Sequence, residues 1–251
     1  MITKNELIEY AKIKNLNLGQ AELDYIQNII LFILSKNNDS KIIFKGGTAL
    51  YKVHNLDRFS EDLDFTADEE LNFDEKIKEI VNTLERFGIF GKIIEKKQYK
   101  DSIKIIMHFE GPLYINTITS KCKIIMDFSL REKLILKPDY LKINHIVTEI
   151  PIFNIFVMKL EEILAEKIRA IMTRKKARDV YDIYYLCKKG IKFNKEMTNK
   201  KLKFYKIVWS YKQFMLKINE KEEIWNNELK HLVDFVPDPK ECFKFIKTYF
   251  K

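Results

Sequence analysis

The apolar positions in the first part of the chain repeat with a helical period. They predict a helix near residues 4–13 and a second helix over residues 20–36, whose apolar stripe is broad enough to pack on a sheet. The short apolar run KIIF at 41–44 then predicts a buried strand that ends at a Gly-Gly pair. The sequence therefore predicts two helices before the first strand, the second of which can pack on a sheet.

The middle of the chain mixes helical and strand patterns. Helices are expected at 48–54 and near 73–87, and the segment DLDFT at 62–66 alternates between polar and apolar residues. Four later segments have the alternation and β-branched residues of strands: GKIIEKKQY, SIKIIMHFE, KCKIIMDFS and HIVTEI. After Pro151 the pattern is helical to the end. We expect an α+β fold, with an α+β half at 1–153 and an all-helical bundle at 154–251.

Composition narrows the class of protein. The 251 residues are 46% hydrophobic, which is enough for one large domain or two smaller ones. Charges interrupt every apolar run well short of about 18 residues, and the opening segment has no apolar signal-peptide core, so we expect a cytoplasmic protein with no membrane partner. The three cysteines are far apart and the histidines are scattered, which argues against a zinc site or a disulfide framework.

Positive charge is concentrated in the second half. Residues 1–150 carry 22 lysines and arginines against 23 acidic residues, whereas residues 151–251 carry 23 against 13. Such asymmetry suits a partner that is a polyanion, with nucleic acid as the leading candidate, although a lysine-rich composition can also serve only solubility. The candidate nucleic-acid contacts lie together in TRKKARDVYDIYYL; they are Arg174, Lys175, Lys176 and Arg178.

The segment KGGTAL has the residues of a phosphate-binding turn. Gly46, Gly47 and Thr48 lie between a predicted strand and a predicted helix. Glycines there let the backbone approach a ligand, and the helix N-terminus offers unpaired N–H groups to an anion. The alternative is a tight connection with no ligand.

Three carboxylates are candidates for a metal site. On a strand, Asp62 and Asp64 point to the same face, where they repel each other unless a cation or a shared proton intervenes. Hard oxygen ligands of this kind suit Mg²⁺ together with substrate phosphates. Asp127 lies opposite the apolar face of KCKIIMDFS, so it can reach the same metals, or act as a general base, if that strand lies beside 62–66. The alternative is an acid-rich strand face in solvent.

The helical half contains a lysine at an apolar position. Lys167 falls in the middle of the apolar stripe of KLEEILAEKIRAIM, so its ammonium must either extend past the core or meet an anion such as a triphosphate. Asp179 and Asp182 are neighbours on the next predicted helix. They can pair locally with Lys175 or Arg178, or they can orient Lys167 and help to position a nucleotide.

Taken in order, the motifs KGGTAL, RFSEDLDF and EEILAEKIRAIMTRKKARDVYDIYYL resemble those of the AbiEii/AbiGii-type nucleotidyltransferase toxins, which are DNA polymerase β-like nucleotidyltransferases. The resemblance covers roughly residues 40–190. It implies nucleotide-phosphate contacts by Gly46, Gly47 and Thr48; a motif serine at Ser60; metal ligands at Asp62 and Asp64; a lysine near the triphosphate at Lys167; and the R-D-x-x-D ending at Asp179 and Asp182. The wider superfamily usually has Gly-Ser where this chain has Gly46-Gly47, so the hydroxyl role falls to Thr48 or Ser60.

The resemblance also implies a fold and an activity. We expect a polymerase β-like mixed sheet with helices, followed by a helical bundle, and an active site in the cleft between them. Two Mg²⁺ ions would assist transfer of a nucleoside monophosphate from a nucleoside triphosphate to an acceptor such as tRNA, within a toxin–antitoxin or abortive-infection system that includes an antitoxin. A protein-nucleotidylating enzyme, a phosphotransferase on the same core, and a non-catalytic nucleic-acid-binding protein are the alternatives.

Overall fold

The computed structural model describes residues 1–36, 40–130 and 134–251, and the chain divides into two compact units. The sheet unit comprises Met1–Asn55, Ser60–Lys133 and Pro138–Val157. The helical unit comprises Met158–Lys251 together with two short segments, Leu56–Phe59 and Leu134–Lys137.

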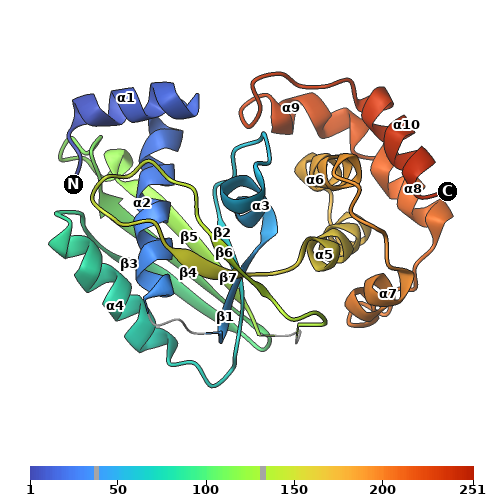
Figure 1. Cartoon of the computed structure of the whole chain (residues 1–251), viewed down its shortest axis with the longest axis horizontal. Helices are drawn as coiled ribbons and strands as arrows, with labels where there is room; N and C mark the ends of the chain where they lie inside the picture. The colour runs from blue at the N-terminus through green and yellow to red at the C-terminus, as the bar shows by residue number, and fades with distance from the viewer. Residues whose placement is uncertain (37–39, 131–133) are drawn as a thin grey trace. The chain divides into compact units, whose positions relative to one another are not determined.

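The sheet unit is built on one mixed sheet of seven strands in the order β3-β4-β5-β2-β1-β7-β6 (Figure 1). The pairs β2–β5 and β1–β7 are parallel, and the other neighbours are antiparallel. The strands are β1 (Ile42–Lys45), β2 (Leu63–Ala67), β3 (Phe90–Tyr99), β4 (Ser102–Glu110), β5 (Cys122–Ser129), β6 (Asp139–Lys142) and β7 (Asn154–Val157). This topology confirms the mixed sheet that was expected.

Helices cover the apolar face of this sheet. Figure 1 shows α2 (Leu18–Ser35) lying across the strands, and α1 (Lys4–Lys14) and α4 (Phe73–Arg86) share its hydrophobic core. Strand alternation sends Phe65 and Phe128 into that core, where their rings stack with centroids 5.1 Å apart. The residues next to them on β2 and β5, among them Asp64 and Asp127, therefore face the other side of the sheet, which we call the polar face.

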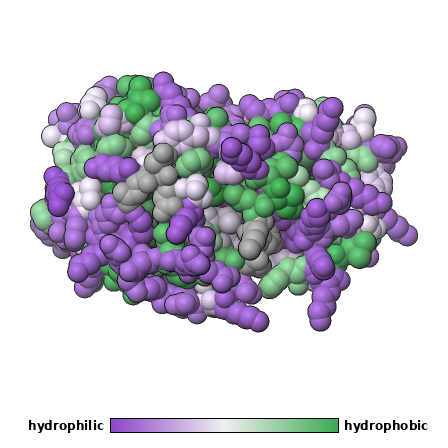
Figure 2. All heavy atoms as spheres, turned by 60° about the horizontal axis from the view of Figure 1, so that its bottom comes forward, coloured by the Kyte–Doolittle hydropathy of each residue, from purple (hydrophilic) through white to green (hydrophobic). Residues whose placement is uncertain are grey.

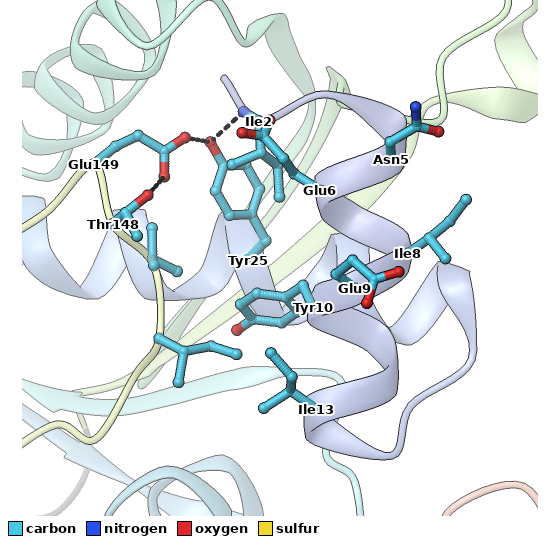
Figure 3. A pocket seen from close by; sticks show the side chains of 12 residues that line it. Ile2, Asn5, Glu6, Ile8, Glu9, Tyr10, Ile13, Tyr25, Thr148 and Glu149 are labelled. Atoms are coloured by element: carbon cyan, nitrogen blue, oxygen red, sulfur yellow. Dashed lines mark hydrogen bonds between the residues drawn. The ribbon is translucent and has the colours of Figure 1, made fainter.

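Three details of the strand predictions are wrong, one of which is that no strand was expected at β6. The segment HIVTEI at 145–150 belongs to the connection between β6 and β7 and forms no strand. Val147 and Ile150 are buried in the core, but they are three residues apart, whereas the residues that share one face of a strand are two apart. Conversely, β7 follows Pro151, where a helical pattern was expected. The connection is held at Glu149, which accepts a hydrogen bond of 2.9 Å from the Tyr25 hydroxyl (Figure 3).

The helical unit contains the expected C-terminal helices. Its α-helices are α5 (Leu160–Thr173), α6 (Ala177–Lys188), α7 (Lys195–Lys203), α8 (Tyr211–Asn219), α9 (Trp225–Leu229) and α10 (Pro239–Tyr249). Trp225 is fully buried and donates its indole N–H to the Pro237 carbonyl at 2.8 Å, which satisfies the one polar group of that ring.

The two short segments join the helical unit through specific hydrogen bonds. The Phe59 N–H donates to the Leu232 carbonyl at 2.7 Å. The fully buried Glu162 carboxylate accepts from the backbone N–H groups of Ile135 at 3.0 Å and Leu136 at 2.9 Å. The chain therefore does not divide at a single boundary at residue 153. β7 belongs to the sheet unit, and the segments Leu56–Phe59 and Leu134–Lys137 belong to the helical unit.

The surface is dominated by hydrophilic side chains. Figure 2 shows one face of the molecule on which they predominate and hydrophobic residues form separate patches. Over the described ranges, no helix combines the length and apolarity that crossing a membrane requires.

Candidate active site

The Gly-Gly turn lies against an aspartate of the neighbouring strand. β1 runs directly into α3 (Gly46–His54), and Gly46 has φ +75°, a conformation that side chains rarely adopt. A Cβ at Gly46 would lie 2.9 Å from the Asp64 Cβ and closer still to one carboxylate oxygen. Glycine at this position therefore lets the Asp64 carboxylate lie against the first turn of the helix.

Gly46→Ala is expected to destabilise the fold by about 1–3 kcal/mol and to displace the Asp64 carboxylate, with loss of activity. The matched control is Gly190→Ala, because Gly190 has φ +74° but nothing within 4 Å of its Cβ position. Denaturant unfolding and nucleotide transfer should be measured for both variants. Equal losses in the two would show that backbone strain alone, and not the approach to Asp64, explains the effect.

The backbone that leads into β2 is held by two helices. The Thr48 hydroxyl on α3 donates to the Asp62 carbonyl and lies 2.9 Å from the Ser60 hydroxyl. Gln27 on α2 donates to the Glu61 carbonyl at 2.7 Å. Thr48 is fully buried, so in this structure its hydroxyl positions the 60–62 segment. The contacts of Thr48 and Ser60 with a nucleotide stay predictions.

Four charged residues lie in one row across the polar face. β2 and β5 are parallel neighbours with Asp64 opposite Asp127, which confirms the adjacency on which a role for Asp127 depends. Lys45 on β1 is opposite Asp64, and Lys104 on β4 is opposite Asp127, with its Nζ 3.8 Å from an Asp127 carboxylate oxygen. The two lysines offset the repulsion between the two adjacent carboxylates. Asp62 lies one residue before β2 and is half-buried.

The carboxylates fit a magnesium ion whose remaining ligands come from a substrate. In the part of the chain that the structure describes, no three His, Cys, Asp or Glu side chains are grouped so that they could hold a metal alone. Mg²⁺ usually takes one or two carboxylates plus phosphate oxygens, and the half-buried pair of Asp64 and Asp127 supplies such ligands.

Lys167 lies within a buried ionic network of the helical unit. Its Nζ is 3.0 Å from an Asp179 oxygen and 2.6 Å from an Asp182 oxygen. Arg58 binds Asp182 through two hydrogen bonds of 2.6 and 2.7 Å, and Arg174 binds Asp179 through two of 2.8 and 2.9 Å. The lysine in the apolar stripe therefore meets anions, and the two aspartates orient it. Contacts of Lys167, Asp179 and Asp182 with a nucleotide stay predictions.

The network keeps both aspartates ionised. Burial favours their neutral form, but Lys167 and Arg174 more than offset this at Asp179, and Arg58 and Lys167 do so at Asp182, so both pKa values are lowered. A carboxyl whose pKa is lower in the folded state adds stability above its ordinary pKa and loses that stability as the pH falls through the lowered value.

Stability is therefore expected to decline as the pH falls below about 4, the ordinary pKa of an aspartate. Arg174→Gln removes one cation from Asp179, so the pKa of Asp179 in the folded protein should rise toward its ordinary value, and the loss of stability between pH 7 and 3 should be smaller than in the unmodified protein. Denaturant midpoints measured between pH 7 and 3 for both proteins check this. Superimposable curves would contradict the contribution of Arg174 to the ionisation of Asp179.

The basic cluster near the start of α6 is partly neutralised. Arg174 binds Asp179, Lys175 lies 2.9 Å from a Glu223 oxygen, and Lys176 lies 3.7 Å from a Glu228 oxygen. The Lys175 and Lys176 side chains are still about half exposed. A nucleic-acid contact by this cluster, which includes Arg178, stays a prediction.

A hollow of 480 Å³ in the sheet unit has different chemistry. Figure 3 shows side chains of α1, α2 and the β6–β7 connection around it, and none of the candidate catalytic residues lines it. Its walls are mainly isoleucine and tyrosine, with carboxylates of Glu6, Glu9 and Glu149. Negative charge of this kind repels a triphosphate, so the hollow does not suit the nucleotide.

Three functional candidates were missed by sequence reasoning. Lys45 and Lys104 flank the carboxylate pair, and Arg58 anchors the Lys167 network. Alternation in SIKIIMHFE places Lys104 on the same face as Ser102 and His108, opposite the buried residues. The sequence could therefore have indicated that Lys104 lies on the polar face. Arg58 adjoins the acidic motif, but its partner Asp182 lies 124 residues later, and no local pattern indicates that pairing.

Two solved structures share this fold at low sequence identity. MenT4, a nucleotidyltransferase toxin from Mycobacterium tuberculosis H37Rv, matches with a TM-score of 0.74 and 18% identity, over 100% of this chain and 89% of that chain. JHP933 from Helicobacter pylori matches with a TM-score of 0.65 and 20% identity, over 93% of this chain and 91% of that chain. No curated protein sequence matches the chain.

At the sequence level, the family model "Nucleotidyl transferase AbiEii toxin, Type IV TA system" matches residues 30–247. That span contains the glycine turn, the carboxylates and the lysine network. It confirms the family resemblance of the three motifs. The chain thus belongs to the AbiEii family, the nucleotidyltransferase toxins of type IV toxin–antitoxin systems, which gives it a nucleotide substrate and a cognate antitoxin.

Proposed function

We propose that this toxin transfers a nucleoside monophosphate from a nucleoside triphosphate to a hydroxyl of an RNA such as tRNA, with Mg²⁺ as cofactor. The observation that carries the proposal is the pair of adjacent carboxylates, Asp64 and Asp127, on the polar face beside a glycine turn. The proposal places the enzyme in the cytoplasm, where nucleotides and tRNA are available, and includes a role in abortive infection.

Different residues of the sheet unit would bind the metal, accept the proton and contact the phosphates. Asp62 and Asp64 would hold Mg²⁺, and Asp127 would accept the proton of the acceptor hydroxyl, or supply a further ligand. The hydroxyl oxygen forms a bond to the α-phosphorus, the bond to the β-phosphate bridging oxygen breaks, and pyrophosphate leaves. When bound, Mg²⁺ would offset negative charge on the attacking and leaving oxygens. The backbone N–H groups at the start of α3, near Gly47, are suited to the phosphates.

The test is incubation of the purified protein with Mg²⁺, total bacterial tRNA and each nucleoside triphosphate labelled at the α-phosphate, beside parallel reactions labelled at the γ-phosphate. We expect α-label on RNA, none from γ-labelled nucleotide, and no product with EDTA. Label on protein would identify a protein-nucleotidylating enzyme, and transfer of γ-label would identify a phosphotransferase. RNA binding without label in any reaction would support the non-catalytic alternative.

A further inference from the structure

The polar face continues outward from the carboxylates as a group of lysines on the three strands β3, β4 and β5. Strand register aligns Lys97 with Lys104, and it aligns Lys92 and Lys123 with His108 from opposite sides. Cross-strand partners in antiparallel pairs point to the same side of a sheet. We call Lys92, Lys97, Lys104 and Lys123 the sheet lysines.

Two of the sheet lysines lie in the same cross-strand row as the candidate base. Lys104 is the cross-strand neighbour of Asp127, and Lys97 is the next residue outward in the same row. Neighbouring strands are about 4.8 Å apart, so Lys97 is attached about 10 Å from the Asp127 backbone. Lys92 and Lys123 extend the basic area along the strands.

These lysines carry more charge than their surroundings neutralise. Lys92 and Lys123 are exposed, and neither takes part in an ion pair within the described residues. Lys97 pairs with Glu95 at 2.7 Å, and Lys104 lies 3.8 Å from Asp127. Two positive charges therefore remain in excess on a surface that adjoins the proposed site of proton removal.

We infer that the sheet lysines bind the phosphate backbone of the acceptor RNA and direct its reactive hydroxyl to Asp127. The inference rests on the proposed function and specifies where the acceptor lies. A polyanion that follows the row places its reactive end at the carboxylates, and its next phosphates fall within reach of the lysines. Contacts of this kind give affinity that depends on salt and that carries no sequence information.

The test uses a triple variant, Lys92→Gln, Lys97→Gln and Lys123→Gln, because these side chains are exposed and none belongs to the catalytic group. The charge-matched control is Lys175→Gln, Lys176→Gln and Arg178→Gln, which removes three of the four positive charges of the basic cluster in the helical unit. For each protein we would measure the KM for tRNA, tRNA binding between 50 and 200 mM salt, and binding of the nucleoside triphosphate with Mg²⁺.

We expect the sheet variant to raise the KM for tRNA at least about tenfold. Each lost phosphate contact lowers the slope of log affinity against log salt by about 0.7 to 0.9, so the slope should fall by roughly two. Nucleotide binding should match that of the unmodified protein. The cluster variant should change the tRNA parameters less.

Three results would overturn the inference in distinguishable ways. If the unmodified protein labels tRNA and the sheet variant has the same KM and salt slope, the acceptor lies elsewhere and the proposed function stands. If the cluster variant shows the larger loss, the helical unit provides the RNA contact. If the unmodified protein labels no RNA, the proposed function fails and this inference fails with it.

Discussion

Asp64→Asn is expected to lower nucleotide transfer by about 1000-fold and to leave the protein folded. The substitution keeps the size of the side chain but removes a charge that is needed to hold a cation against a triphosphate. Loss of one preorganised electrostatic group typically costs 100- to 1000-fold in rate, and loss of a metal ligand compounds this. The matched control is Asp68→Asn, because Asp68 is exposed and follows the same strand. That variant should retain full activity.

The stability of the Asp64 variant separates catalysis from folding. Lys45 and Lys104 already offset the repulsion between Asp64 and Asp127, so neutralising Asp64 should change the melting temperature little. Addition of Mg²⁺ with a non-hydrolysable nucleotide should raise the melting temperature of the unmodified protein and not that of the variant. An inactive variant that still gains the full shift would contradict the assignment of Asp64 as a metal ligand.

Asp182→Asn is expected to destabilise the protein by about 3–5 kcal/mol, the typical cost of removing one partner from a buried ion pair. Asp182 is fully buried and is bound by both Arg58 and Lys167. Its neutralisation leaves two cations with a single remaining carboxylate, Asp179, which already binds Arg174. Urea unfolding at pH 7 would measure the loss.

Lys167→Met is the informative comparison for this prediction. Removal of that ammonium leaves two cations and two carboxylates, in the pairs Arg58–Asp182 and Arg174–Asp179. The three cations and two carboxylates of the network thus become two of each, and the methionine suits the apolar stripe, so the loss of stability should be smaller than for Asp182→Asn. A greater loss for Lys167→Met would show that the lysine, and not the balance of charges, holds the network together.

The carboxylate pair shows how much of the site could be predicted from sequence. Alternation fixed the face of Asp127, because its apolar neighbours on KCKIIMDFS must point to the core. The sequence could not show which strand lies beside β5, because β2 and β5 pair although they are far apart in the chain. The role of Asp127 in the site was therefore conditional on that pairing. The helices α2 and α5 were predictable for the same local reason, because each buries one continuous stripe.

The errors have a common physical cause. HIVTEI alternates as a strand does, yet its buried residues pack as a loop on a core that other elements provide. β6 and β7 were missed because each has only four residues and follows a proline. Pro138 directly precedes β6, and Pro151 lies three residues before β7. Short strands of this kind are stabilised by their neighbours in the sheet, so their own sequences contain little signal.

The pairing of Arg58 with Asp182 has a consequence for the synthesis of the protein. Arg58 is made early, and its carboxylate partner follows 124 residues later. At a translation rate of about 5–20 residues per second, Asp182 is synthesised roughly 6–25 s after Arg58. A ribosome that stops after the sheet unit would therefore release a fragment in which Leu56–Phe59 has no binding site. A chain that ends between the sheet unit and Asp182 should therefore be degraded by proteases and should not accumulate as a partly active toxin.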